Sequence, residues 1–112
     1  MPPMTITETN LTAMARSIVE AVQPEQVILF GSLARGETTE ESDIDLLIVE
    51  QEGFTGRNRW RALQIISQAI SDFRNSKDIL LYSQEEVMRW RDSLNHVVGH
   101  AMREGRSLYE RS

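Results

Sequence analysis

The chain of 112 residues is long enough for one domain and too short for a second independent core, so its length excludes a two-domain enzyme. With 40% hydrophobic and 26% charged residues, the composition is that of a globular protein and excludes a disordered or fibrous chain. Because cysteine is absent, disulfides, thiolate metal sites and a cysteine nucleophile are excluded as well. Without a membrane-length apolar run or a signal-peptide pattern, we expect a cytoplasmic protein with no membrane contact.

The net charge of -5 is unevenly distributed along the chain. Residues 1–56 carry ten acids and two bases, whereas residues 57–112 carry seven acids and ten bases. Such an asymmetry indicates either a binding surface or helix faces of different composition. Eleven of the twelve bases are arginines, which suit bidentate contact with phosphate or carboxylate. The acidic total disfavours direct binding to long nucleic acid.

A loose N-terminal leader over residues 1–7 and a single domain over residues 8–112 are the expected organisation. The leader holds prolines and threonines and has no usable periodicity. Apolar residues at helical spacing then predict a helix that begins at Thr7 or Thr9 and ends at Val22.

Two strands are expected next, on either side of a polar connection. A β-branched, apolar run predicts a buried strand over Gln26–Phe30, which Gly31 ends. The polar connection over Ser32–Glu41 has room for a short helix. A second apolar run predicts another strand over Asp43–Glu50.

The second half of the chain adds a long helix, a strand and two shorter helices. An apolar stripe predicts the long helix over Arg57–Phe73, and a third strand is expected over Asp78–Tyr82. Ser83, with a glutamate three residues later, has the form of a capping box that opens a helix. The last helix is expected over Ser93–Glu104. This order predicts an α/β (α+β) fold, a small mixed β-sheet of three to four strands flanked by helices.

Two aspartates at the start of the second strand are candidates for chemistry. Side chains alternate along a strand, so Asp43 and Asp45 point to one face, about 7 Å apart. Two such carboxylates repel each other unless a cation lies between them, and oxygen ligands of this kind suit Mg²⁺. The alternative is that both acids face solvent or cap a turn.

Gly31 and Ser32, placed just after a buried strand, favour the functional interpretation of these acids. Glycine lets the backbone approach a ligand closely, and the serine hydroxyl can donate to a phosphate oxygen. A phosphate cradle and a carboxylate pair together describe a site for a nucleoside triphosphate with Mg²⁺. A P-loop is excluded because Glu37 stands where that motif needs a lysine.

The segment from Gly31 to Leu46 carries a longer signature. Its elements are Gly31-Ser32, Ala34-Arg35-Gly36 and Ser42-Asp43-x-Asp45-Leu46. This pattern resembles the signature of the minimal nucleotidyltransferases (MNT), small members of the DNA polymerase β-like nucleotidyltransferase superfamily. The resemblance implies a polymerase β-like nucleotidyltransferase core.

The same resemblance implies roles for individual residues. Gly31 and Ser32 would hold the triphosphate of ATP, and Asp43 and Asp45 would bind two Mg²⁺ ions. The superfamily's third carboxylate corresponds to Asp78, as a metal ligand or as the base that takes the acceptor's proton; its alternative is a turn aspartate.

Two further positions of the signature are weaker candidates for nucleotide binding. Arg35 would contact phosphate or a partner carboxylate, or else form a surface ion pair. Ser42 would orient the aspartate loop by hydrogen bonding.

By resemblance, the function is that of an antitoxin. MNT proteins pair with HEPN-domain proteins, which implies Mg²⁺-dependent transfer of AMP from ATP to a hydroxyl, expected to be a tyrosine, of a HEPN ribonuclease toxin. A chain of this length has no residues for an acceptor domain, so we expect the partner to supply the acceptor. The alternatives are an antitoxin that masks the toxin by binding alone and a nucleotidyltransferase that acts on small molecules.

Other polar and aromatic residues are assigned no catalytic role. His96 and His100 lie four apart on an expected helix but have no evident third metal ligand, so surface or partner-facing histidines are expected. Trp60 and Trp90 are expected to be core or interface anchors. The arginines of the second half are expected to lie on solvated helix faces or to guide an acidic partner or a polyphosphate; they include Arg57, Arg59, Arg61, Arg89 and Arg91.

Overall fold

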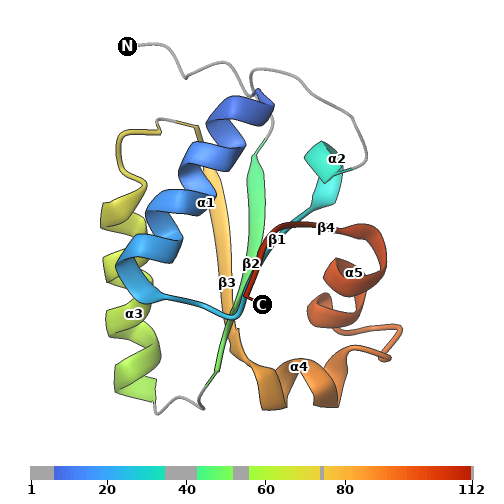
Figure 1. The fold of residues 1–112 in the computed structure, drawn as a ribbon. Coiled ribbons are helices and arrows are strands. Elements are labelled where there is room, and N and C mark those ends of the chain that lie inside the picture. The colour runs from blue at the N-terminus through green and yellow to red at the C-terminus, as the bar shows by residue number, and fades with distance from the viewer. Residues whose placement is uncertain (1–6, 35–42, 52–55, 74, 112) are drawn as a thin grey trace.

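The computed structural model describes residues 7–34, 43–51, 56–73 and 75–111. Within these residues the chain forms five helices and four strands (Figure 1). In chain order they are α1 (Glu8–Val22), β1 (Gln26–Phe30), α2 (Gly31–Ala34), β2 (Ile44–Glu50), α3 (Gly56–Ala69), β3 (Lys77–Ser83), α4 (Gln84–Trp90), α5 (Val97–Glu104) and β4 (Arg106–Glu110). None of the described helices is long and apolar enough to cross a membrane.

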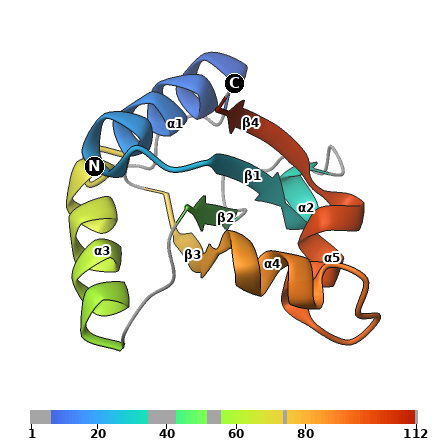
Figure 2. The same ribbon diagram turned by 60° about the horizontal axis from the view of Figure 1, so that its bottom comes forward.

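The four strands form one mixed sheet in the order β3-β2-β1-β4. Strand β1 runs antiparallel to both β2 and β4, whereas β2 and β3 are parallel. Helices cover both faces of the sheet, α1 and α3 on one side and α4 and α5 on the other (Figures 1 and 2). The predicted mixed sheet flanked by helices is therefore confirmed.

Each sheet face has its own hydrophobic core, because apolar side chains alternate along the strands. Leu46 and Ile48 of β2 pack with residues of α1 and α3, and Leu47 and Val49 pack with residues of α4 and α5. Along β2, even-numbered residues thus face α1 and α3. Odd-numbered residues face α4 and α5, and Asp45 is among them.

The helix starts follow the capping residues of the sequence. Thr7 caps α1, its side chain accepting a hydrogen bond from the backbone N–H of Asn10 at 3.0 Å. Ser83 and Glu86 form the predicted capping box of α4. The last helix begins at Val97 instead of Ser93, because His96 is its N-cap residue and accepts from the backbone N–H of Val98 at 3.1 Å.

The strand β4 was not predicted as a separate element of the chain. Gly105 ends α5 and lies against β1 so closely that a Cβ there would be 2.6 Å from Cγ2 of Ile28 and 2.8 Å from the carbonyl oxygen of Leu29. This close approach lets the next residues pair with β1 as the fourth strand.

Candidate functional site

Three of the predicted site residues lie at one edge of the sheet. Asp43 directly precedes β2, Asp45 is the second residue of β2, and Asp78 is the second residue of β3. Because β2 and β3 are parallel, their first residues lie at the same edge, and Asp45 is the direct register partner of Asp78. Leu80 and Tyr82 of β3 pack with the core on the α4 and α5 side, so Asp78 shares that face with Asp45. The fold thus brings together acids that are 33 residues apart in the chain.

Gly31 lies at the same edge, because β1 runs antiparallel to β2 and ends where β2 begins. Phe30, the last residue of β1, pairs with Asp45, and Gly31 follows it with φ +73°. A Cβ at Gly31 would lie 2.2 Å from Oδ2 of Asp45. The carboxylate of Asp45 therefore occupies the space that any other side chain at position 31 would need, and only glycine fits both the space and the backbone conformation.

The residues at this edge fit Mg²⁺ in their chemistry. Asp43 and Asp78 are exposed to solvent and Asp45 is half-buried beside Gly31, and carboxylate oxygens are the hard ligands that Mg²⁺ prefers. Within the described ranges, however, no three His, Asp or Glu side chains come close enough together to hold a metal ion. The donor type and the shared face thus fit a magnesium site, while the side chains do not converge on one point.

Lys77 does not neutralise these acids, although it precedes Asp78. Alternation along β3 turns its side chain to the α1 and α3 face, where Nζ donates to the carbonyl oxygen of Phe73 beyond the end of α3. Burial lowers the pKa of Lys77. Lys77 thus adds no positive charge to the sheet face that Asp45 and Asp78 share.

Several predicted nucleotide-binding residues fall outside the described part of the structure. Arg35 and Ser42 lie in the undescribed stretch 35–42, and of Ser32 only the backbone, within α2, is described. Their roles stay predictions.

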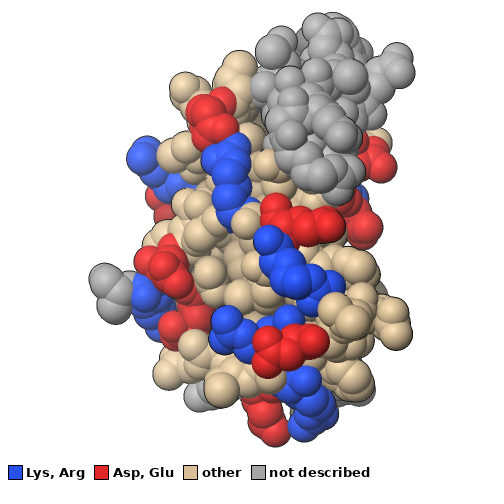
Figure 3. Space-filling model, turned by 90° about the vertical axis from the view of Figure 1, so that its right-hand side faces the viewer, with Lys and Arg blue, Asp and Glu red and all other residues tan. Residues whose placement is uncertain are grey.

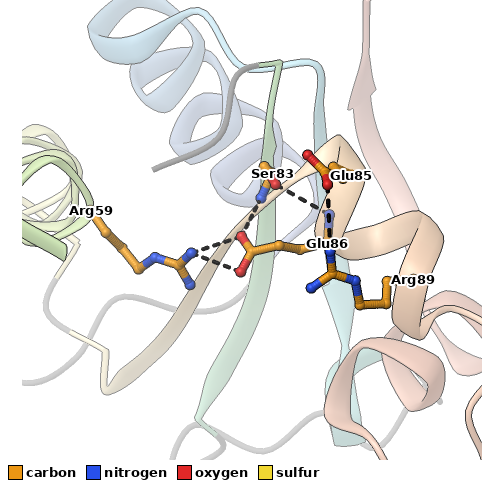
Figure 4. Close-up of polar contacts among 5 residues, drawn as sticks. All are labelled: Arg59, Ser83, Glu85, Glu86 and Arg89. Atoms are coloured by element: carbon orange, nitrogen blue, oxygen red, sulfur yellow. Dashed lines mark hydrogen bonds and ion pairs between the residues drawn. The ribbon is translucent and has the colours of Figure 1, made fainter. Parts of the chain in front are cut away.

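The opposite end of β3 is held by an ion pair that the sequence patterns did not indicate. Nη2 of Arg59 on α3 donates to both carboxylate oxygens of Glu86 on α4, at 2.7 and 2.8 Å (Figure 4). The guanidinium also lies 5.5 Å from the ring centroid of Tyr82 on β3. Arg59 is therefore a link between the helices of the two sheet faces, and its assignment to a solvated face or an acidic partner is wrong.

The Glu86 carboxyl is stabilised in its charged form. Burial raises its pKa, but hydrogen bonds from Arg59 and from the backbone of Ser83 outweigh this effect, so the pKa of Glu86 lies below its ordinary value. The sequence signal for this cluster was the capping box alone, which gave no information about Arg59.

The structure also shows where the two histidines and the two tryptophans of the sequence lie. The imidazole of His96 stacks on Trp90 with ring centroids 4.5 Å apart, and it caps α5, so His96 and His100 do not share a helix face as a metal pair would. Trp60, at the beginning of the apolar stripe of α3, is 62% exposed, so the first of its two expected positions, in the core, is wrong. Ile66 and Ile70 of the same stripe are fully buried.

Comparisons with known proteins agree with this architecture. A family profile described as the nucleotidyltransferase domain matches residues 12–100. Two Methanocaldococcus jannaschii proteins named as putative protein adenylyltransferases are similar over shorter stretches. MJ0141 is 46% identical over 44 residues, 39% of this chain and 44% of that protein. MJ0604 is 63% identical over 30 residues, 27% of this chain and 30% of that protein. The aligned stretches thus span less than half of these relatives.

Solved structures with the same fold include both single proteins and complexes. A putative nucleotidyltransferase from Sulfolobus solfataricus is similar with a TM-score of 0.60 and 26% identity, over 93% of this chain and 84% of that one. A complex of a tri-AMPylated Shewanella oneidensis HEPN toxin with its MNT antitoxin contains a similar chain with a TM-score of 0.56, at 15% identity, over 94% of this chain and 74% of that one. At that identity the likeness concerns the fold. The family profile covers most of the chain, and with this fold it shows that the chain belongs to the nucleotidyltransferase domain family, as the Gly31–Leu46 signature predicts.

Proposed function

We propose that this protein transfers AMP from ATP to a hydroxyl group of a partner protein, a HEPN ribonuclease toxin, with release of pyrophosphate, and so acts as its antitoxin. The observation that carries the proposal is the edge at which Asp45 lies against Gly31 and pairs in register with Asp78. Nothing in the core requires two adjacent acids there, since like charges on neighbouring strands destabilise a sheet. A metal and nucleotide site accounts for their presence.

In this proposal each residue of the edge has a distinct task. Asp43, Asp45 and Asp78 hold Mg²⁺, which when bound offsets their mutual repulsion and polarises the phosphates of ATP. Gly31 leaves room for the Asp45 carboxylate beside the nucleotide. Asp78, whose side chain is exposed, is also the group to which we assign the proton of the incoming hydroxyl.

Phosphate binding is assigned to residues of the signature segment. Ser32 donates to the triphosphate, Arg35 pairs with it, and Ser42 orients the loop that carries Asp43. These three assignments rest on the resemblance to the MNT family.

A protein acceptor is supported by the relatives of this chain. Two of them are named as putative protein adenylyltransferases, and one structural neighbour is an MNT antitoxin bound to an AMPylated HEPN toxin. We therefore expect a toxin partner, a tyrosine acceptor and a cytoplasmic location.

Labelled ATP tests the proposal directly. The chain, Mg²⁺ and α-labelled ATP are incubated with the co-purified partner, and transfer of label to the partner is followed by gel electrophoresis. Asp43→Asn combined with Asp45→Asn is expected to abolish transfer and neutralisation of toxicity. Asp92→Asn, at an exposed aspartate beyond α4, is the matched control and is expected to retain both.

A binding-only antitoxin is the second candidate, favoured by the lack of a converged three-ligand cluster among the described side chains. Neutralisation that survives the double substitution without any labelling would establish that candidate instead. Label transfer to small alcohols in the absence of a protein acceptor would point to a small-molecule enzyme.

A further inference from the structure

A groove lies at the end of the sheet opposite the acidic edge. It has a volume of about 310 Å³ and runs between α4 and the end of β4. Its apolar lining includes Val49 and Val87, which are buried, and the half-buried Met102. Asp45 and Val49 are four residues apart on β2, roughly 13 Å along the strand, so the groove is separate from the acidic edge.

The two walls of the groove carry opposite charges that pair with no other residue in the described part of the chain. Arg91, beyond α4, and Glu110, at the end of β4, both line the groove, and no ion pair or side-chain hydrogen bond joins either of them to another described residue. The other charged pair in the lining is satisfied, because Nη1 of Arg111 lies 3.2 Å from Oε1 of Glu25. The four charges cancel, so the groove is locally neutral on a chain of net charge -5.

An apolar side chain protrudes beside this groove. Met88 lines the α4 wall and is 72% exposed, an unusual position for a methionine side chain. Figure 3, which views the molecule from the side of α4 and α5, shows basic and acidic side chains interspersed rather than gathered in one patch of either sign. A surface of this kind is suited to a partner with the same mixture of charges.

We propose that the groove binds a second copy of this chain in a two-fold symmetric dimer. In such a contact each surface meets its own copy, so a residue pair across the interface occurs twice. Met88 of one protomer enters the groove of its partner, and Arg91 of each meets Glu110 of the other. Arg91 and Glu110 have opposite charges and lie on opposite walls of the groove. A two-fold symmetric contact can therefore pair each of them with its counterpart in the other protomer.

The dimer leaves the acidic edge of each protomer open. Asp43, Asp45 and Asp78 lie at the beginning of β2 and β3, whereas the groove lies at the end of β2. Self-association through the groove is thus independent of nucleotide transfer, and it does not depend on the proposed function.

Charge exchange across the contact tests the proposal. Sedimentation velocity on the purified chain over a range of concentrations is expected to show a reversible dimer. Arg91→Glu alone or Glu110→Arg alone brings like charges together twice in each dimer and is expected to weaken dimerisation at least about tenfold. The double exchange, Arg91→Glu with Glu110→Arg, restores both pairs and is expected to recover the dimer. Circular dichroism verifies that each variant is folded.

Arg61→Glu is the matched control, since Arg61 is an exposed arginine on α3, on the other face of the sheet. Met88→Asp is expected to abolish the dimer without a change of charge at positions 91 or 110. A wild-type chain that stays monomeric at every concentration would overturn the proposal and leave the groove to a different protein. Dimerisation that is as strong in both single exchanges as in the wild type would also overturn the proposal. So would a double exchange that fails to restore the dimer.

Discussion

The carboxylate of Asp45 fills the space over the Cα atom of Gly31, with Oδ2 only 2.2 Å from where a Cβ would stand. Gly31→Ala is therefore expected to displace the carboxylate and to strain a backbone with φ +73°. We expect a loss of stability of about 2 kcal/mol and a loss of nucleotidyl transfer. Urea unfolding and label transfer measure the two effects.

A double-mutant cycle separates the contact from the backbone strain. In an Asp45→Ala background the obstructing carboxylate is absent, so Gly31→Ala is expected to cost only the strain of the left-handed conformation, about 1 kcal/mol. Equal losses in the two backgrounds would mean that the Asp45 carboxylate does not restrict position 31.

The register pairing of Asp45 with Asp78 predicts a gain in stability when one charge is removed. Like charges directly opposite each other on neighbouring strands are destabilising, so Asp78→Asn is expected to stabilise the metal-free chain by about 0.5 kcal/mol. Added Mg²⁺ is expected to raise the melting temperature of the wild type and to have little effect on the variant.

Calorimetry in EDTA and in Mg²⁺ provides both measurements. Asp92→Asn, at an exposed aspartate beyond α4, which follows the opposite end of β3, is the control and is expected to leave the response to Mg²⁺ unchanged. If the variant responds to Mg²⁺ like the wild type, Asp78 is not a metal ligand.

The acidic edge was predictable from the sequence because its geometry follows from local rules. Alternation along a strand places Asp43 and Asp45 on one face, and an apolar run directly after Asp78 marks a strand of the same kind. The pairing of β2 with β3 then needed only the fold implied by the family resemblance. The contact between Gly31 and Asp45, in contrast, depends on how closely β1 approaches β2, which no local pattern encodes.

Other features depend on tertiary contacts and were missed for that reason. The strand β4 has two charged ends and only Leu108 and Tyr109 as apolar residues, so its pattern is weak; its pairing with β1 follows from the close packing of Gly105. The stripe of α3 indicated which side of the helix faces the core. It did not indicate that Trp60, near the beginning of the helix, lies outside the core.

The carboxyl group of Glu50, at the end of β2, is expected to make the stability of the fold depend on pH. Burial raises the pKa of Glu50 to about 7, an effect that the charge of Arg111 partly offsets and that of Glu25 reinforces. The Oε1 atom of Glu50 is buried and has no hydrogen-bond partner among the residues that the structure describes. Between the unfolded pKa, near 4.5, and pH 7 the folded chain holds a proton that the unfolded chain has released. Stability is therefore expected to fall as the pH rises through this window and to level off above it.

Glu50→Gln removes the ionisation and is expected to flatten this part of the pH profile. Because Glu50 is only half-buried, solvent screening reduces the effect, and we expect a gain of about 1 kcal/mol for the variant at pH 8 and little change at pH 4.5. Urea midpoints at the two pH values measure it. Glu20→Gln, an exposed residue of α1, is the control; a profile of Glu50→Gln that matches the wild type would exclude Glu50 as the titrating group.

The ion pair between Arg59 and Glu86 is expected to contribute more to stability than the other pair drawn in Figure 4. Its side chains are 31% and 26% exposed and bind through two hydrogen bonds, whereas those of Arg89 and Glu85 are 59% and 80% exposed and lie 3.4 Å apart. Arg59→Ala leaves the Glu86 carboxylate without its main partner, at a cost of about 2 kcal/mol. Arg89→Ala is expected to cost less than about 0.5 kcal/mol.

Urea unfolding of both alanine variants and of Arg59→Lys tests this difference. Lysine retains the charge but cannot reproduce the guanidinium's planar contact with the Tyr82 ring and the carboxylate, so it is expected to restore less than half of the loss. Nucleotidyl transfer is expected to persist in folded Arg59→Ala, because the pair lies at the end of β3 opposite Asp78. Equal costs for Arg59→Ala and Arg89→Ala would show that the link between α3 and α4 does not stabilise the fold.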